Sequence, residues 1–181
     1  MLRTIAGVGA LVLLSSTAAA QESESAFRFG IGAGKVTIEA DEVDLKGDAW
    51  GWEIFGGYEF NRYIAVEVSY LDGGEADDVI GEGVKVVADT YGYAASVIGS
   101  LPVSDSVSVY ARAGFLKWKA DESLKVDGEP VLTEKVDGSD PIFGVGVAGL
   151  LEGAWVRLEY RIADLDDADL SMIGASIAWR F

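Results

Sequence analysis

Hydrophobic and polar residues alternate with a period of two along most of the chain beyond residue 25. Successive side chains of a β-strand point to opposite faces, so this alternation predicts strands with one apolar face and one polar or small face. The end of the chain is an example, because Ile173, Ala175, Ile177, Trp179 and Phe181 alternate with small or polar residues. Eight segments share the pattern: 27–34, 50–60, 63–70, 91–97, 107–115, 143–147, 156–162 and 173–181. No segment shows the 3.6-residue stripe of an amphipathic helix.

The links between these segments are alternately long and short. Short links are predicted at 61–62, 102–106 and 151–153, and long ones at 39–48, 72–89, 119–140 and 163–170. Strands of about ten residues, with short turns on one rim and long loops on the other, are typical of small outer-membrane barrels. The pattern therefore predicts an all-β fold, namely an eight-stranded antiparallel up-and-down transmembrane β-barrel.

The face opposite the apolar one carries nearly balanced charges. Its charged residues are Arg28, Glu53, Glu59, Glu67, Arg112, Arg157, Glu159, Arg161 and Arg180. In a lipid-embedded barrel the apolar face points outward, so these charges would pair inside a narrow lumen. Alternation alone leaves open a soluble periplasmic barrel that encloses an apolar ligand. The aromatic chain end favours the membrane, and we expect Trp179 and Phe181 at the membrane interface.

The first twenty residues have the features of a secretory signal. Arg3 precedes an apolar stretch at 5–14, and the small residues Ala18 and Ala20 stand just before Gln21. The apolar stretch is too short to form a membrane-spanning helix. We therefore predict a cleaved signal peptide at 1–20 and a barrel domain at 21–181. With no cysteine in the chain, an exported form could not rely on disulfides.

The strongly acidic composition bears on whether the chain binds nucleic acid or divalent cations. The net charge is −16, which argues against nucleic acid, whose phosphates need Lys and Arg. Most acidic residues fall in the four long links, where they indicate solvated loops outside the bilayer. Weak binding of divalent cations by these loops stays open. The acidic segment 163–171 lacks the residue spacing of an EF-hand calcium loop, so no metal site is assigned.

The residues needed for common catalytic arrangements are missing. The chain has no histidine and no cysteine, so Ser-His and Cys-His arrangements are unavailable. Glu67 and Glu159 share their face with several arginines, which favours structural ion pairs over catalysis. The spacing G-x-G-x-x-G at 144–149 runs directly into another strand rather than a helix, which argues against a dinucleotide site. We therefore expect no enzymatic activity and no cofactor.

Several segments resemble the eight-stranded transmembrane domain of the OmpA family, in the same order and at similar spacing. They are IFGGYEFNRYIAVEVSYLD, PVSDSVSVYARAGFLKWKAD, PIFGVGV, VRLEYR and the terminal WRF. The resemblance implies a monomeric barrel in the cell outer membrane, delivered by periplasmic chaperones and inserted by the barrel-assembly machinery. It also implies that the terminal Phe181 is read as an assembly signal. Because the chain ends at Phe181, we expect no peptidoglycan-binding domain.

The same resemblance implies ion pairs inside the barrel. Glu67, Arg112, Arg157 and Glu159 stand at matching strand positions, and with Glu53 they are the residues expected to pair. Two positions depart from the family pattern, because Ile98 stands in place of an interior lysine and Ala148 in place of a second interior glutamate. Pore behaviour therefore does not transfer.

These observations predict a small outer-membrane barrel with a structural or porin-like role, surrounded by lipid and lipopolysaccharide. An eight-stranded barrel has an interior just wide enough for side chains, so we expect a narrow polar lumen with little or no stable conductance. The alternative is an adhesion or binding module acting through the long loops, above all 119–140, toward an unknown partner.

Overall fold

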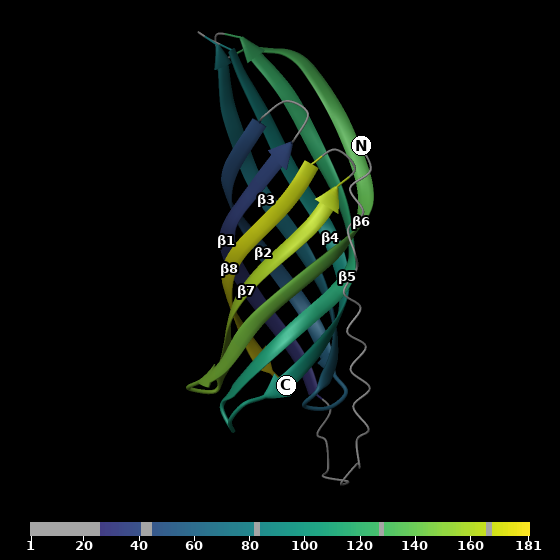
Figure 1. Cartoon of the computed structure of the whole chain (residues 1–181), viewed down its shortest axis with the longest axis vertical. Helices are drawn as coiled ribbons and strands as arrows, with labels where there is room; N and C mark the ends of the chain where they lie inside the picture. Colours follow the sequence, from purple (N-terminus) through teal and green to yellow (C-terminus); the bar gives the residue numbers. More distant parts are fainter. Residues whose placement is uncertain (1–25, 41–44, 82–83, 127–128, 166–167) are drawn as a thin grey trace, which may run out of the picture.

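The chain folds into a single closed barrel (Figure 1). The computed structural model describes residues 26–40, 45–81, 84–126, 129–165 and 168–181. The eight strands are β1 (Ala26–Ala40), β2 (Leu45–Glu59), β3 (Ile64–Gly81), β4 (Val84–Pro102), β5 (Val107–Val126), β6 (Glu129–Leu151), β7 (Ala154–Leu165) and β8 (Ala168–Arg180). Each pairs antiparallel with its neighbours in sequence, and β8 pairs back with β1. The predicted eight-stranded up-and-down barrel is confirmed.

The chain end takes part in closing the barrel. β8 ends at Arg180, but Phe181 continues the pairing beyond the strand. The backbone N–H of Phe27 donates to the Phe181 carbonyl at 3.2 Å, and the Phe181 N–H donates to the Phe27 carbonyl at 2.9 Å. The last residue is therefore held by two backbone hydrogen bonds, which explains why the alternating pattern runs to the end of the sequence.

One end of the barrel, which we call the turn end, carries three tight connections at 60–63, 103–106 and 152–153. The side chain of Asn61 accepts hydrogen bonds from the backbone N–H groups of Tyr63 and Ile64, which fixes the first turn. In the last turn Glu152 and Gly153 both have positive φ, 50° and 87°. Two such residues form the tight hairpin turns that match the twist of antiparallel strands. The predicted short links are confirmed.

At the opposite end, which we call the hairpin end, the strands are longer than predicted. They run from 12 residues in β7 to 23 in β6, so most of each predicted long loop is paired strand. The prediction of ten-residue strands is wrong because apolar alternation marks only the part of a strand that faces lipid. Backbone pairing continues past that part without any hydrophobic signal. Residues 41–44, 82–83, 127–128 and 166–167 lie outside the described part of the chain.

The barrel divides into two sheets toward the hairpin end. Pairing of β2 with β3 stops at Trp52 and Asp72, and pairing of β6 with β7 stops at Ile142 and Ala163. Beyond these points β3 to β6 form one sheet, which reaches furthest (Figure 1), and the other four strands form a second. A register shift and a positive φ of 74° at Gly74 mark the point where β3 leaves β2.

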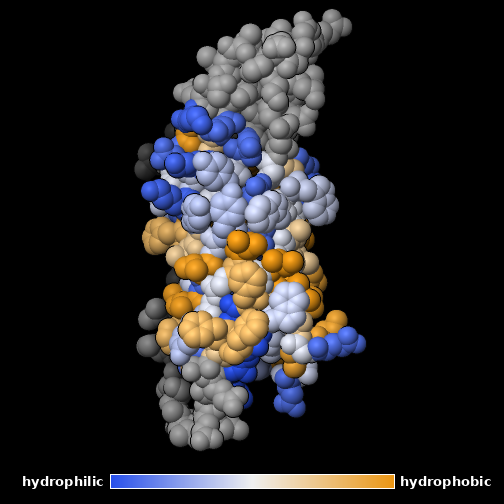
Figure 2. Space-filling view, turned by 180° about the vertical axis from the view of Figure 1, so that it is seen from behind, coloured by the Kyte–Doolittle hydropathy of each residue, from blue (hydrophilic) through white to orange (hydrophobic). Residues whose placement is uncertain are grey.

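Large apolar side chains point outward around the barrel. Figure 2 shows them as a band across the visible face, with more hydrophilic residues toward the hairpin end. The outward residues include Phe29, Ile31, Trp52, Ile54, Val68, Tyr93, Val97, Phe115, Phe143, Val145, Leu158, Tyr160, Ile162 and Ile173. A contiguous apolar belt of this kind fits lipid rather than water. The alternative of a soluble barrel with its apolar face inside is therefore wrong.

No helix in the described part of the chain is long and apolar enough to cross a membrane.

Candidate functional site in the barrel lumen

Six charged side chains fill the middle of the lumen. They come from four strands, and each stands at a strand position whose side chain points into the lumen, because side chains of a strand point to its two faces in turn. All six are buried, with exposed fractions between 2% and 7%. We call this set the interior ion chain: Glu53 on β2, Glu67 on β3, Arg112 on β5, and Arg157, Glu159 and Arg161 on β7.

Glu67 lies between two guanidinium groups of the interior ion chain. Its Oε1 accepts a hydrogen bond from Arg112 Nη2 at 2.7 Å, and its Oε2 accepts one from Arg157 Nη1 at 2.8 Å. Arg112 Nε also lies 2.6 Å from Glu159 Oε1, as an ion pair without hydrogen-bond alignment. Arg157 Nε donates to Ser176 Oγ on β8 at 3.0 Å. The contacts thus bridge strands on several sides of the lumen.

Arg161 completes the chain at its other end. Its Nη1 and Nη2 donate to the two carboxylate oxygens of Glu53 at 2.7 Å, and Nη2 also donates to Glu159 Oε2 at 2.7 Å. The five residues predicted to pair thus lie in one connected set, and Arg161, which the sequence placed on the same inner face, joins them. Its two-residue spacing from Glu159 is the sequence signal that it faces inward. Arginines and glutamates alternate along the chain, so its charges balance.

Glycine makes room for these charges on β6. A Cβ at Gly144 would lie 2.8 Å from Glu159 Oε1 and 3.0 Å from Arg112 Cγ. Side chains larger than hydrogen would therefore displace the interior ion chain. This close approach explains the first glycine of the G-x-G-x-x-G spacing, and at Gly146 a Cβ would lie 2.6 Å from the Tyr110 ring. No dinucleotide fold follows this segment, because β6 continues through a turn into β7.

An aromatic ring narrows the lumen further. The guanidinium of Arg157 lies over the ring of Phe55, with 4.0 Å between its Cζ and the ring centroid. Phe55 is 1% exposed and reaches across to Gly30, where a Cβ would collide with its ring. Cation–π contact at a buried position adds to the stabilisation of the guanidinium.

Between the interior ion chain and the hairpin end the lumen is apolar. The buried residues of this apolar segment are Ala94, Leu116, Trp118, Ala120, Ile142, Ala163 and Leu165. Trp118 Nε1 donates to Asp140 Oδ2 at 2.6 Å, which satisfies its polar atom. The expectation of a polar lumen is therefore wrong for this part. The missed signal is that Leu116 and Trp118 share the odd–even phase of Arg112 along β5.

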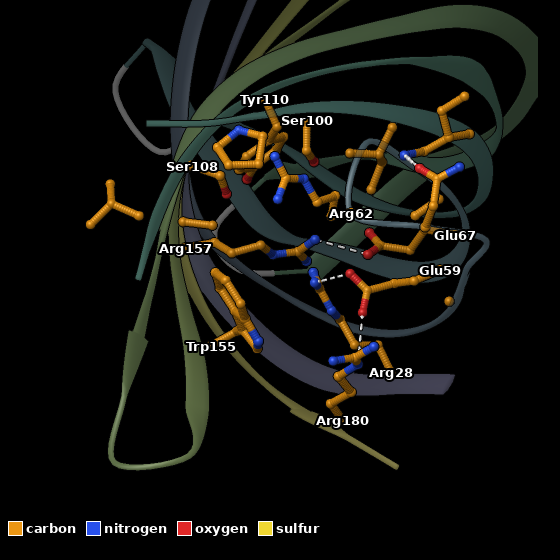
Figure 3. A pocket seen from close by; sticks show the side chains of 18 of the residues that line it. Arg28, Glu59, Arg62, Glu67, Ser100, Ser108, Tyr110, Trp155, Arg157 and Arg180 are labelled. Carbon is orange, nitrogen blue, oxygen red and sulfur yellow. Dashed lines mark hydrogen bonds and ion pairs between the residues drawn. The ribbon is translucent and has the colours of Figure 1, made fainter. Parts of the chain in front are cut away.

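The residues at the two positions that depart from the family pattern are also buried in apolar contacts. Ile98 on β4 and Ala148 on β6 belong to one buried cluster with Tyr110 on β5. Below them, at the turn end, Arg28 pairs with Glu59, and Arg180 Nε lies 3.3 Å from Glu59 Oε2 (Figure 3). Glu59 thus contacts two guanidiniums.

The proposed interface residues lie on the outer surface near the turn end. Trp179 is opposite Phe29 in the β8–β1 register, and both side chains are exposed. Phe181 is 80% exposed. Aromatic side chains at the ends of the lipid-facing belt are typical of membrane barrels.

The acidic side chains of the interior ion chain are held by arginines. No group of three or more His, Cys, Asp or Glu side chains placed to hold a metal ion occurs among the described residues. Glu67 and Glu159 each contact two arginines. The cation-binding hypothesis for 163–171 falls partly on residues 166–168, whose side chains lie outside the described set.

Comparisons with known proteins agree with this fold. The family model described as "Outer membrane protein beta-barrel domain" matches residues 6–181. Outer membrane protein A of Klebsiella aerogenes is 30% identical over 142 residues, covering 70% of this chain and 37% of the relative. Outer membrane protein P5 of Haemophilus influenzae is 29% identical over 176 residues, covering 87% and 49%. The chain thus spans less than half the length of these relatives.

A solved structure of similar fold is Ail, the attachment invasion locus protein of Yersinia pestis, in complex with the heparin analogue sucrose octasulfate. It superposes with a TM-score of 0.62 at 18% sequence identity, over 87% of this chain and 99% of that one. At this identity the likeness concerns the fold.

Proposed function

This chain belongs to the outer membrane protein β-barrel domain family, and from that premise we propose that it is a monomeric structural barrel whose lumen is closed to ions and solutes. Its place is the cell outer membrane, as for its relatives. There its outward apolar belt meets lipid, and we propose that lipopolysaccharide surrounds its outer half.

The observation that supports a closed lumen is the arrangement of two different barriers in series. The interior ion chain fills the middle of the lumen with charges that already neutralise one another. The apolar segment, with Leu116, Trp118 and Ile142, lies between those charges and the hairpin end. A permeating ion would have to break buried ion pairs and then lose its water among hydrocarbon side chains, and both steps are costly.

Planar-bilayer recording tests this proposal. The mature protein is expected to give little or no stable conductance. The double variant L116A/W118A removes two large side chains from the apolar segment and is expected to raise the frequency of openings. The matched control F115A/K117A changes two outward-facing neighbours on the same strand and should show no increase in channel openings. Large, uniform openings of the unmodified protein would contradict a closed lumen.

We propose further that the barrel has no catalytic role and no cofactor. The support is the absence of His and Cys from the sequence and the pairing of Glu67 and Glu159 with arginines. Incubation with phospholipid, lipid A and peptide substrates is expected to leave them intact. Turnover that disappears in E67Q or E159Q would contradict the proposal.

Delivery to the membrane is proposed to follow the family route. The signal peptide at 1–20 is removed on export, and periplasmic chaperones and the barrel-assembly machinery carry and insert the chain. Intact-mass spectrometry of the protein from outer membranes should give a chain that begins at Gln21. A mass that includes residues 1–20 would refute the cleavage.

A second candidate function is attachment to a surface partner, favoured by the sheet of β3 to β6. Beyond Asp72 on β3 and before Ile142 on β6 this sheet has two edges that, among the described residues, pair with no neighbouring strand of the barrel. Such edges and their loops can receive a partner. Ail, the attachment invasion locus protein, has a similar fold.

Deleting Glu122 to Gly138 tests attachment, because it removes the end of the hairpin formed by the two longest strands, β5 and β6. Cells that carry the full barrel should adhere to cultured host cells more than cells carrying the deletion variant. Altered gel mobility on heating reports that both proteins are folded barrels. Equal adhesion of the two strains would count against this function.

A further inference from the structure

A cavity of about 670 Å³ opens at the turn end of the barrel, below the interior ion chain (Figure 3). Residues of two tight turns and the turn-end parts of all eight strands line it. We propose that this turn-end cavity is a binding site for a small oxyanion of the phosphate class, either inorganic phosphate or a phosphate monoester. Nothing in the closed-lumen proposal requires such a site.

The first argument is charge. Four arginines line the cavity, namely Arg28, Arg62, Arg157 and Arg180, in a protein whose net charge is −16. The acidic groups inside it are Glu59 and Glu67, with Asp105 in a turn at its rim. Positive charge is therefore concentrated at one end of an otherwise acidic molecule, in a concave site with low-dielectric walls, where its field is strongest.

The two glutamates of the cavity wall do not cancel this charge. Glu59 is shared between Arg28 and Arg180, and Glu67 between Arg157 and Arg112. Each carboxylate is thus already held by two guanidiniums. At the mouth, Arg28 and Arg180 both contact Glu59, and Arg62 adds a further guanidinium to the wall.

The second argument is that buried donors in the cavity wall lack acceptors. Arg157 Nη2, Tyr110 Oη and Arg28 Nε have no hydrogen-bond partner in the described part of the chain. Arg157 and Tyr110 are more than nine-tenths buried. Unsatisfied donors at such burial cost free energy, and the side chains that carry these three donors all line the cavity.

Rigid contacts hold two of these donors in place. The Arg28 guanidinium lies over the indole of Trp155, 5.2 Å from the centroid, and Arg157 lies over Phe55. Stacked arginines lose little further freedom when they bind an anion. Ser100 and Ser108 add hydroxyl groups to the same wall.

The arrangement of donors selects the ligand class. They come from β1, β5 and β7 and from the turn that carries Arg62, so they approach a bound group from several directions. A tetrahedral phosphate offers acceptors in all these directions, whereas a carboxylate offers them in one plane. The volume exceeds that of a bare phosphate and leaves room for the organic part of a monoester.

Calorimetric titration of the mature protein in a maltoside detergent at low salt tests the site. The ligands are inorganic phosphate and glycerol 1-phosphate, with glycerol as the uncharged control, and phosphorus NMR provides a second readout. We expect saturable binding of at least one anion, and none of glycerol. Tighter binding of glycerol 1-phosphate than of inorganic phosphate would mean that its glycerol part also contacts the cavity. Equal binding of the two would mean that only the phosphate group is recognised.

Three variants connect binding to the cavity. R28Q is expected to weaken binding about tenfold, since hydrogen bonds to charged groups contribute that much. R62Q and Y110F, which leave the interior ion chain untouched, should each weaken it several-fold. The control K117Q removes one exposed positive charge near the hairpin end and should bind like the unmodified protein. Heat-dependent gel mobility checks that each variant is folded.

The proposal is overturned if neither anion binds below about 10 mM, a range that covers weak physiological sites. It is equally overturned if R62Q and Y110F bind as tightly as the unmodified protein. A loss in K117Q as large as that in R28Q would show general charge attraction and would also refute a built site.

Discussion

Arg161 on β7 donates two hydrogen bonds across the lumen to the carboxylate of Glu53 on β2, each 2.7 Å long. The pair joins strands that are not neighbours in the barrel, because β8 and β1 lie between them on one side. Two parallel N–H···O bonds fix both the distance and the orientation of the groups. The barrel wall is thus tied together through its interior as well as around its circumference.

Removing one partner of this pair should destabilise the barrel strongly. R161L leaves the buried carboxylate of Glu53 without its guanidinium, and loss of one partner of a buried ion pair costs about 3–5 kcal/mol. The double variant E53L/R161L removes both charges and should recover part of that loss. Urea unfolding in detergent, followed by tryptophan fluorescence, measures both. Equal destabilisation of R161L and E53L/R161L would contradict an energetic coupling between Glu53 and Arg161.

Glycine at position 144 should be essential for packing, and glycine at 99 should not. The variant G144A places a Cβ against Glu159 and Arg112 and is expected to lower the free energy of unfolding by about 1–3 kcal/mol. Gly99 has no atom within 4 Å of the same position, so G99A should change stability little. The same urea titration compares them. Similar losses of unfolding free energy in both variants would mean that glycine is needed for the strand backbone and not for packing at position 144.

A charge placed in the apolar belt should be tolerated much less than the same charge in a turn. Val145 on β6 and Val103 in the second turn are both 59% exposed, so they differ in location rather than burial. V145R is expected to cost about 2–4 kcal/mol in a bilayer, whereas V103R should be nearly neutral. Unfolding from lipid vesicles measures both, and equal costs would argue against the position of the belt.

The side chain of Phe181 should matter for assembly in cells and little for the finished fold. Its backbone, not its ring, makes the two hydrogen bonds to Phe27. F181A is therefore expected to lower the amount of barrel in outer membranes, while protein refolded in detergent keeps its stability. F143A, another exposed aromatic on the lipid-facing surface, is the control. A normal amount of the F181A barrel in outer membranes would contradict a role of Phe181 as an assembly signal.

Period-two alternation predicted the eight strands and their faces because lipid outside and a packed lumen inside impose opposite chemistry on successive residues. It failed where that contrast ends. Past the lipid boundary the strands of the hairpin end continue on backbone hydrogen bonds alone, which any residue except proline can make. Strand lengths could therefore not be obtained from side-chain pattern.

The lumen was only partly predictable for a related reason. Charged residues on the inner face, such as Glu67 and Arg157, are conspicuous because their immediate neighbours in the sequence are apolar. Leu116, Trp118 and Ile142 face inward too, but they look like lipid-facing residues in a sequence. Only the register with Arg112 distinguishes them. Which arginine meets which glutamate depends on strand stagger, and one sequence does not contain that information.

The division of the barrel into two sheets above the Trp52–Asp72 and Ile142–Ala163 pairs separates what natural selection can change from what it must keep. Hairpins of one sheet can lengthen, shorten or be exchanged without altering the register of the other, because no backbone ladder joins them there. The closed ring below keeps its pairing throughout. Foreign peptides grafted into the hairpins of the β3 to β6 sheet would inherit that independence.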